Sequence, residues 1–196
     1  MPRAGLNTTE VVAAAAVLAD EAGIEAVSLA AVATRLGVKA PALYKHVDSI
    51  GDLRRRIATL AMTELGDALR DALQGKSGAD AIGAFFKVVQ SYIAKHPGRY
   101  DATTGAEFRG ADDPLLIAAT RVIGSIRAVL SGYGIQPGEL DHAIRMLRCT
   151  IHGYAALQAA EGFQWSKDPG ESVAWMIRFF DAGLATVGGK HSRGQR

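Results

Sequence analysis

The hydrophobic residues of this chain recur at helical spacing along almost its whole length. Near the N-terminus, one side of a helix would carry Val11, Ala14, Ala15, Leu18 and Ala22. No segment sustains the two-residue alternation of a half-buried strand, and the chain is rich in alanine, leucine, arginine and glutamate, which favour helix. The pattern therefore predicts an all-α fold with about nine helices.

Capping residues and glycines mark the expected helix ends. Asn7, with Glu10 three positions later, predicts a capping box, and Gly23 suits the left-handed residue that ends the first helix. Ser28 is expected to cap a short second helix that Gly37 ends. A third helix is expected from about Ala40, with Pro41 in its first turn, and a long fourth helix from Asp48 or Ser49 to about Ala72. After a loop at 74–78, a fifth helix is expected to about Lys95 and a short sixth near 99–109. The last three are expected from Asp113 to about Ser131, over about 138–161 and over about 170–187.

The helix lengths predict two functional parts. Three short helices come first, a long helix follows, and a larger group of helices makes up the rest, with no internal repeat. We therefore expect an N-terminal three-helix domain at 1–52, a helical domain at 53–188 and a polar, disordered tail at 189–196.

Charge is almost balanced over the whole chain but not along it. With 22 Lys and Arg residues against 20 Asp and Glu residues, any surface for a polyanion has to be local. Between residues 35 and 56, only Asp48 and Asp52 oppose six basic residues: Arg35, Lys39, Lys45, Arg54, Arg55 and Arg56. This local excess of four positive charges is a candidate surface for nucleic acid.

Cysteine content and hydropathy bear on location. Cys149 is the only cysteine, so no disulfide can form within this chain, which fits a reducing cytoplasm. Residues 11–19 (VVAAAAVLA) have the length of a signal-peptide core, but they keep helical spacing and run into Asp20 and Glu21, so a core helix is the better interpretation. No stretch is long enough to span a membrane. We expect a cytoplasmic protein with no membrane partner.

The first three helices have the organisation of a helix-turn-helix module, in which two short helices meet through LGV (36–38) and a third packs beneath them. The apolar positions that would hold them together are Leu29, Val32, Leu36, Val38, Leu43 and Val47. The segment AGIEAVSLAAVATRLGVKAPALYKHVDSIGDL (22–53) resembles the DNA-binding domain of the tetracycline-repressor (TetR) family of regulators. In that family a serine or threonine caps the second helix, LGV makes the turn, and LYxHV or a close variant ends the recognition helix.

The resemblance implies contact with double-stranded operator DNA through the recognition helix and Ser28. By analogy, Lys39, Ala40, Pro41 and Ala42 face base edges, Tyr44, His46 and Ser28 bind phosphates, and Lys45 reaches bases or backbone. Alanine and proline cannot make bidentate base contacts, which leaves the two lysines as polar readers. Taken alone, Tyr44 would be a packing aromatic and His46 an exposed residue. Ile50 stands where the family often has a phosphate-binding lysine; Arg54, one turn later, either replaces it or belongs to a solvated face with Arg55 and Arg56.

The larger half is expected to dimerise and to bind a small-molecule effector, as in the family. The last two helices would form the homodimer interface through Gly153, Ala156, Leu157, Ala160, Trp175, Phe179 and Leu184. Apolar residues with a few polar ones are candidates for the effector pocket: Phe86, Val89, Tyr100, Phe108, Ile123, Met146, Cys149 and His152. The alternative for both sets is that they are ordinary core of the chain, where such residues are commonly found. The segment MLRCTIHGYAALQAAEGF (146–163) resembles one TetR subgroup that carries Trp-His-Gly there, with Ile151 in place of the tryptophan.

Signals for a metal, a cofactor or catalysis are weak. His142, Cys149 and His152 share one helix face, but their spacing is not that of a zinc motif, and we expect no metal. The GKS at 75–77 lacks the first glycine and the preceding strand of a phosphate loop. We therefore expect no cofactor and no enzyme. The prediction is a repressor released from a palindromic operator by a small molecule; the alternative is a helical dimeric small-molecule-binding protein without sequence-specific DNA binding.

Overall fold

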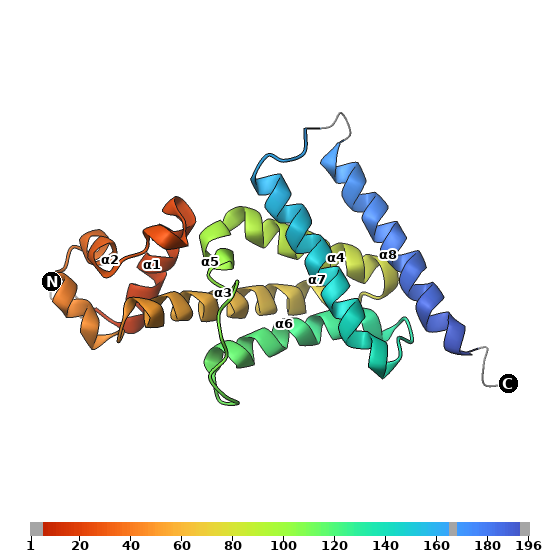
Figure 1. The fold of residues 1–196 in the computed structure, drawn as a ribbon, viewed down its shortest axis with the longest axis horizontal. Coiled ribbons are helices and arrows are strands. Elements are labelled where there is room, and N and C mark those ends of the chain that lie inside the picture. The colour runs from red at the N-terminus through yellow and green to blue at the C-terminus, as the bar shows by residue number, and fades with distance from the viewer. Residues whose placement is uncertain (1–5, 165–167, 193–196) are drawn as a thin grey trace. The chain divides into compact units, whose positions relative to one another are not determined.

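The computed structural model describes residues 6–164 and 168–192, and its regular elements over those ranges are all helical (Figure 1). They are α1 (Thr8–Ala22), η1 (Ile24–Ala26), α2 (Leu29–Leu36), η2 (Ala40–Lys45), α3 (Ile50–Leu73), α4 (Gly78–Lys95), α5 (Pro97–Asp101), α6 (Pro114–Ser131), α7 (Pro137–Ala159) and α8 (Pro169–Ser192). The two η elements are 3-10 helices. The all-α prediction is confirmed.

The predicted N-terminal caps of the first two helices form as the sequence indicates, whereas Gly23 ends α1 with φ 86° and ψ 156°, outside the left-handed helical region predicted for it. The Glu10 N–H donates to the Asn7 side chain at 2.9 Å and the Asn7 N–H donates to the Glu10 carboxylate at 3.0 Å, which completes the capping box of α1. The Ala31 N–H donates to the Ser28 hydroxyl at 3.1 Å and caps α2. Gly37 ends α2 in the left-handed conformation, with φ 66° and ψ 32°.

Three elements differ from the prediction. The third helix predicted for the N-terminal domain, η2, is a six-residue 3-10 helix rather than an α-helix. Helix α5 ends at Asp101, well before the predicted residue 109, and the chain continues as a turn over residues 102–105 in which Gly105 adopts positive φ. Helix α8 continues to Ser192 instead of ending near 187, so the tail predicted to be disordered from 189 begins as helix; residues 193–196 lie outside the described part of the chain.

The chain forms two compact units. The first comprises residues up to Glu64 together with Lys95–Ala119, and the second comprises Leu65–Ala94 together with the chain from Thr120 onward. Helices α3 and α6 each contribute residues to both units. The functional division predicted after residue 52 stays a prediction, and the packing of α5 with α1 extends the first compact unit beyond it.

The core of the first unit brings α1, α2, η2 and α3 together. The residues with no more than a few per cent exposure there are Val11, Ala15, Ala16, Ala19, Val27, Val32, Ala33, Leu43, Val47, Leu53 and Ile57, and Leu29, Leu36 and Val38 pack against them. The three alanines of α1 are small enough to let the neighbouring helix backbones approach closely. The predicted helix-turn-helix core is therefore present.

A cluster of polar contacts joins α1 to α5 within the first unit. The Asp20 carboxylate accepts the backbone N–H of Arg99 at 2.9 Å, and the Nδ1 atom of His96 lies 3.0 Å from it. The Arg99 guanidinium also approaches Asp20, with Nε 2.9 Å from Oδ2 although its N–H is not directed at that oxygen, and it donates to Glu64 at 3.1 Å. Beside these contacts, Gly98 lies directly against the carbonyl of Ala19. We call this cluster the Asp20 clamp.

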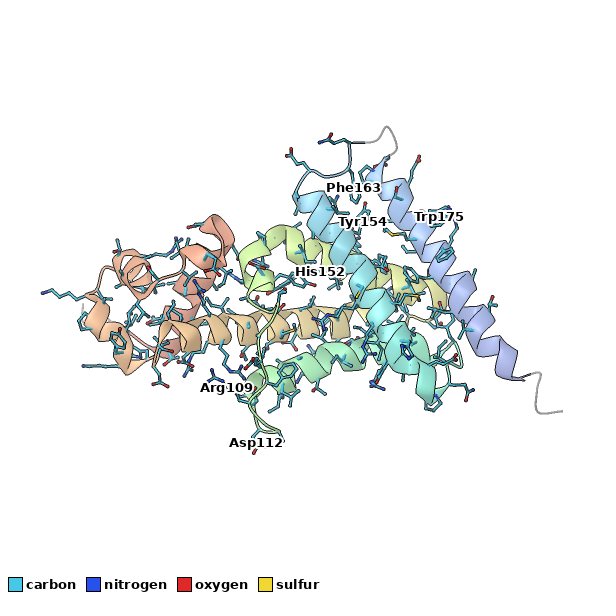
Figure 2. The ribbon with its side chains drawn as sticks, in the orientation of Figure 1. Arg109, Asp112, His152, Tyr154, Phe163 and Trp175 are labelled. Atoms are coloured by element: carbon cyan, nitrogen blue, oxygen red, sulfur yellow. The ribbon has the colours of Figure 1, made fainter. Side chains whose placement is uncertain are left out.

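The second unit packs around apolar residues of α4, α6, α7, α8 and the C-terminal part of α3. Its most buried large side chains are Ile82, Phe86, Leu69, Leu130, Leu147 and Ile151. Two tyrosine hydroxyls find acceptors: Tyr133 donates to Asp181 and Tyr154 donates to the Pro169 carbonyl, both at 2.6 Å. Burial and the adjacent Asp181 carboxylate both raise the pKa of Tyr133. The ring of Tyr154 also lies against that of Phe163, with centroids 5.0 Å apart (Figure 2).

The length of α6 contradicts the expectation that no stretch of the chain is long enough to span a membrane. Over the described residues, α6 has the length and the mean hydropathy, 1.4, of a membrane-spanning segment. Core helices of water-soluble proteins pass the same test. The apolar side chains of α6 include the buried Leu115, Ile126 and Leu130, and its Arg127 forms an ion pair with Asp141 at 3.1 Å.

The close approach of α5 to α1 generates a stability prediction. A Cβ atom added at Gly98 would lie 1.9 Å from the Ala19 carbonyl oxygen, so Gly98→Ala has to push the two helices apart. We expect the free energy of unfolding in urea to fall by about 1–3 kcal/mol. Gly124→Ala in α6 is the control, because its Cβ would meet nothing within 4 Å, and it should be neutral or slightly stabilising. Equal stability of the two variants would contradict the close packing described here.

Candidate DNA-binding surface

The recognition segment is a short helix held by two apolar anchors. Leu43 and Val47 are fully buried in the core of the first unit, and the αL turn at Gly37 sets the direction in which η2 leaves α2. Pro41 lies in the first turn of η2, where its missing N–H leaves no hydrogen bond unmade. The buried anchors fix which side of η2 faces outward.

The outward side of η2 presents the predicted contact residues. Tyr44 is 60% exposed, an unusual environment for an aromatic ring, and Lys39, Pro41 and Lys45 are also exposed. Ala40, Ala42 and His46 are half-buried, and Ser28 is exposed at the start of α2. The structure therefore brings all eight predicted DNA-contact residues onto the surface of one helix-turn-helix module. The interpretation of Tyr44 as a packing aromatic does not fit this exposure.

The arginines of the basic patch are all paired with carboxylates. The pairs are Arg35 with Glu21 at 2.5 and 2.9 Å, Arg54 with Glu25 at 3.1 to 3.3 Å, Arg55 with Asp113, and Arg56 with Asp52 at 2.8 Å. Among the described residues, only Lys39 and Lys45 of the six basic positions have no partner of opposite charge. The sequence count of four excess charges therefore overstates the free positive charge of this surface. Three of the four arginines find their partners 14 to 58 residues away, which leaves no local signal in the sequence, whereas Arg56 and Asp52 are an i,i+4 pair within α3.

Arg55 is part of a buried ion pair rather than of the exposed surface. Its guanidinium donates to the Asp113 carboxylate and to the carbonyl of Glu107. Asp113 also accepts the N–H groups of Arg109 at 2.7 Å and of Leu115 at 3.0 Å. Burial by itself raises the pKa of the Asp113 carboxyl, but these hydrogen bonds outweigh burial and hold the pKa below its ordinary value. Arg55 is therefore committed to structure.

The predicted effector residues are divided between the two units. Tyr100, half-buried, and Phe108, exposed, belong to the first unit. In the second, Phe86 and Val89 are buried in α4, whereas Ile123, Met146, Cys149 and His152 are exposed. None of the eight lines either of two open cavities. One, of about 480 Å³, lies in the first unit between α1, α3 and residues 113–114; the other, of about 580 Å³, lies in the second unit between α4, α7 and α8.

The predicted interface residues are mostly exposed on α7 and α8. Ala156, Leu157 and Ala160 are exposed and Gly153 is half-buried. Trp175, labelled in Figure 2, is 56% exposed and Phe179 is 60% exposed. Their rings stack with centroids 5.3 Å apart. Leu184 is instead buried in the core of its own chain, because it lies on the same side of α8 as Phe180. The burial of Leu184 argues against its place in the predicted interface, and the other six residues stay a prediction.

The described residues contain no group of three His, Cys, Asp or Glu side chains placed to hold a metal ion. His142, Cys149 and His152 are all exposed on α7 and are not gathered into a site.

A short, exposed reading helix on a helix-turn-helix core defines a class of DNA-binding protein, and comparison with known proteins places the chain within it. Residues 11–57 match the family described as bacterial regulatory proteins, tetR family, and residues 82–180 match the tetracyclin repressor-like, C-terminal domain. The chain belongs to the tetracycline repressor (TetR) family of bacterial transcriptional regulators, and it is a regulator rather than an enzyme.

Individual relatives agree with this assignment. An uncharacterised HTH-type transcriptional regulator of Bacillus subtilis (strain 168), YobS, is 31% identical over 93% of this chain and 95% of its own length. Another from Mycobacterium tuberculosis, Rv0681, is 35% identical over 79% of this chain and 71% of its own. The solved structure of SCO7222, a TetR from Streptomyces coelicolor, superposes with a TM-score of 0.73 at 19% identity, covering 93% of this chain and 99% of that one, which supports the fold.

The lowered pKa of Asp113 gives a pH-dependent prediction. A carboxyl whose pKa is lower in the folded than in the unfolded protein stabilises the fold fully above its ordinary pKa of about 3.9, and this stabilisation is lost as the pH falls through the lowered value. Asp113→Asn should therefore reduce the free energy of unfolding at neutral pH, with the deficit shrinking below about pH 4. Asp112→Asn, at the exposed neighbouring position (Figure 2), should have little effect at any pH. A deficit independent of pH would contradict the role given to the Asp113 carboxylate.

Proposed function

We propose that this regulator binds a pseudo-palindromic operator as a homodimer and is released from DNA by a small molecule. The observation that carries the DNA part is the exposure of Lys39, Tyr44 and Lys45 on a helix whose other side is anchored by Leu43 and Val47. A free ammonium can reach a base edge or a phosphate, and a tyrosine hydroxyl can donate to a phosphate oxygen. Two copies would place their η2 helices in successive major grooves.

The homodimer is supported by the exposed apolar side chains of α7 and α8. The ring of Phe179 lies against that of Phe180, with centroids 6.2 Å apart, and the ring of Phe180 lies against that of Phe86, with centroids 5.8 Å apart. These ring contacts connect the exposed pair of Trp175 and Phe179 to the core. Rigid aromatic anchors beside the small residues of α7 favour close packing of two copies. A second copy would remove these rings from water.

The effector is proposed on family grounds, with the predicted pocket residues as its candidates. Phe86 and Val89 supply apolar surface in α4, and His152 supplies a polar group from α7. The open cavity between α4, α7 and α8, at about 580 Å³, is a second candidate in the same unit, since ligand sites commonly measure about 300–1,000 Å³. Binding of the effector would shift the protein toward a state that holds DNA less tightly.

The proposal also includes the subgroup of the family and the location of the protein in the cell. The Ile151-His152-Gly153 sequence of α7 supports membership of the subgroup that carries Trp-His-Gly, with isoleucine replacing the tryptophan. A cytoplasmic location goes with access to DNA and with the exposed, free Cys149.

The DNA contacts are tested by two substitutions in η2. Tyr44→Phe removes one phosphate-directed hydroxyl and Lys45→Ala one free charge, and both should weaken binding to the DNA flanking the gene by about ten-fold in gel shifts at low salt. Lys45→Ala should also reduce the slope of log affinity against log salt by about 0.9. Lys76→Ala, at an exposed lysine of the second unit, is the control and should leave both quantities unchanged.

The alternative function has its own outcome in that experiment. A protein that binds no flanking fragment at low salt but still binds a small apolar molecule would be a ligand-binding dimer without sequence-specific DNA recognition.

The dimer is tested by placing a charge within the aromatic pair. Phe179→Glu would bury a carboxylate between the two copies, so sedimentation should show monomers at micromolar concentration where the unaltered chain forms dimers. Ile117→Glu is the matched control, because Ile117 is also an exposed apolar residue but lies on α6 in the first unit. Dissociation by both variants, or by neither, would show that the α7 and α8 surface is not the interface.

A further inference from the structure

Two arginine pairs of the basic patch, Arg35 with Glu21 and Arg54 with Glu25, differ in the lengths of their hydrogen bonds. In the pair with Glu21, the two guanidinium nitrogens of Arg35 lie 2.5 and 2.9 Å from the carboxylate oxygens. In the pair with Glu25, the Arg54 nitrogens lie 3.1 and 3.3 Å from the carboxylate, with a further contact of 3.3 Å to the Glu25 carbonyl. Charge-assisted hydrogen bonds are typically about 2.7–2.9 Å long. The Arg54 pair is therefore longer than such bonds usually are.

Arg54 is also incompletely satisfied. Its Nε atom is buried and has no hydrogen-bond partner among the described residues, although a buried donor normally finds one. Its carboxylate partner is 85% exposed, so water screens the attraction. The Arg54 side chain as a whole is 33% exposed, so its guanidinium can change partner without unfolding its surroundings.

The position of the pair is next to a predicted phosphate ligand. Glu25 lies in η1, three residues before Ser28, and a three-residue separation spans at most about 11 Å. Through its contact with the Glu25 carbonyl, Arg54 is held against the turn that leads into α2. A DNA strand seated on Ser28 would bring phosphate oxygens to this turn.

We propose that Arg54 exchanges partners when DNA binds, leaving Glu25 and forming a bidentate contact with a backbone phosphate. A phosphate accepts the planar guanidinium fork as a carboxylate does, and its binding releases counterions from the DNA. Glu25 then acts as a competitor: it holds Arg54 in the free protein and repels the approaching backbone. This inference rests on the proposed DNA-binding function and adds a phosphate contact and an opposing carboxylate to it.

The test replaces each pair without changing the net charge. In Glu25→Gln with Arg54→Gln, one negative and one positive charge are lost together, and Glu21→Gln with Arg35→Gln is the matched control at the firmly held pair. Affinity for a short mixed-sequence duplex is measured between about 50 and 200 mM salt, because phosphate contacts are independent of sequence. We expect the first double variant to lose about 0.9 from the salt slope, so that the unaltered protein loses about 3.5-fold more affinity over this range, and the control to keep its slope.

Two single substitutions separate partner exchange from a structural role. Glu25→Gln alone should tighten DNA binding at low salt, because it frees Arg54 and removes a negative charge. Arg54→Lys should keep the salt slope, whereas Arg54→Gln should lose it, and this comparison decides the matter if the double variant does not fold, as judged by its thermal melt.

The outcomes distinguish this inference from the proposed function. A protein that does not bind the duplex at low salt overturns both. Binding by the unaltered protein, with an unchanged slope in the Glu25 and Arg54 double variant, overturns partner exchange alone. Equal loss of slope in both double variants also overturns it, since the loosely and firmly held pairs would then act alike.

Discussion

The Asp20 clamp is the contact on which the organisation of the first unit depends. Gly98 allows the α5 backbone to touch the carbonyl of Ala19, and this approach places the Asp20 carboxylate within reach of the Arg99 amide and guanidinium. Displacing the Asp20 carboxylate costs free energy, because the Arg99 backbone N–H would lose its acceptor and the Arg99 guanidinium would lose an adjacent opposite charge. Since α1 supplies the alanine surface against which α2 and η2 pack, the position of η2 depends on a contact made far from DNA.

In the basic patch between residues 35 and 56, ion pairing divides the positive charges into those committed to contacts within the protein and those free to contact DNA. Arginine forms bidentate pairs with carboxylates, so it is well suited to join helices, whereas lysine keeps a mobile point charge. Here the arginines are paired with acidic residues and the free charges belong to Lys39 and Lys45. A protein of nearly balanced composition can therefore present a small, specific positive surface without a large attractive field.

Local signals in the sequence predicted what depends on local chemistry. The caps at Asn7 and Ser28 and the αL turn at Gly37 follow from rules that involve neighbouring residues, and the family resemblance located the exposed face of η2. Contacts between distant residues could not be predicted in this way. The pairing of Arg55 with Asp113, the burial of Leu184 and the close approach of Gly188 to the Tyr133 carbonyl all depend on the tertiary arrangement.

The short length of η2 limits how much sequence the protein can read. Six residues at about 2.0 Å per residue give a helix about 12 Å long, which spans about three to four base pairs at 3.4 Å each. Two copies would read about seven base pairs, and a given seven-base-pair pattern recurs on the order of sixty times among about a million genomic positions. Base contacts from η2 thus restrict binding to a limited set of genomic sites, and the spacing and deformability of the DNA between half-sites have to select among these sites.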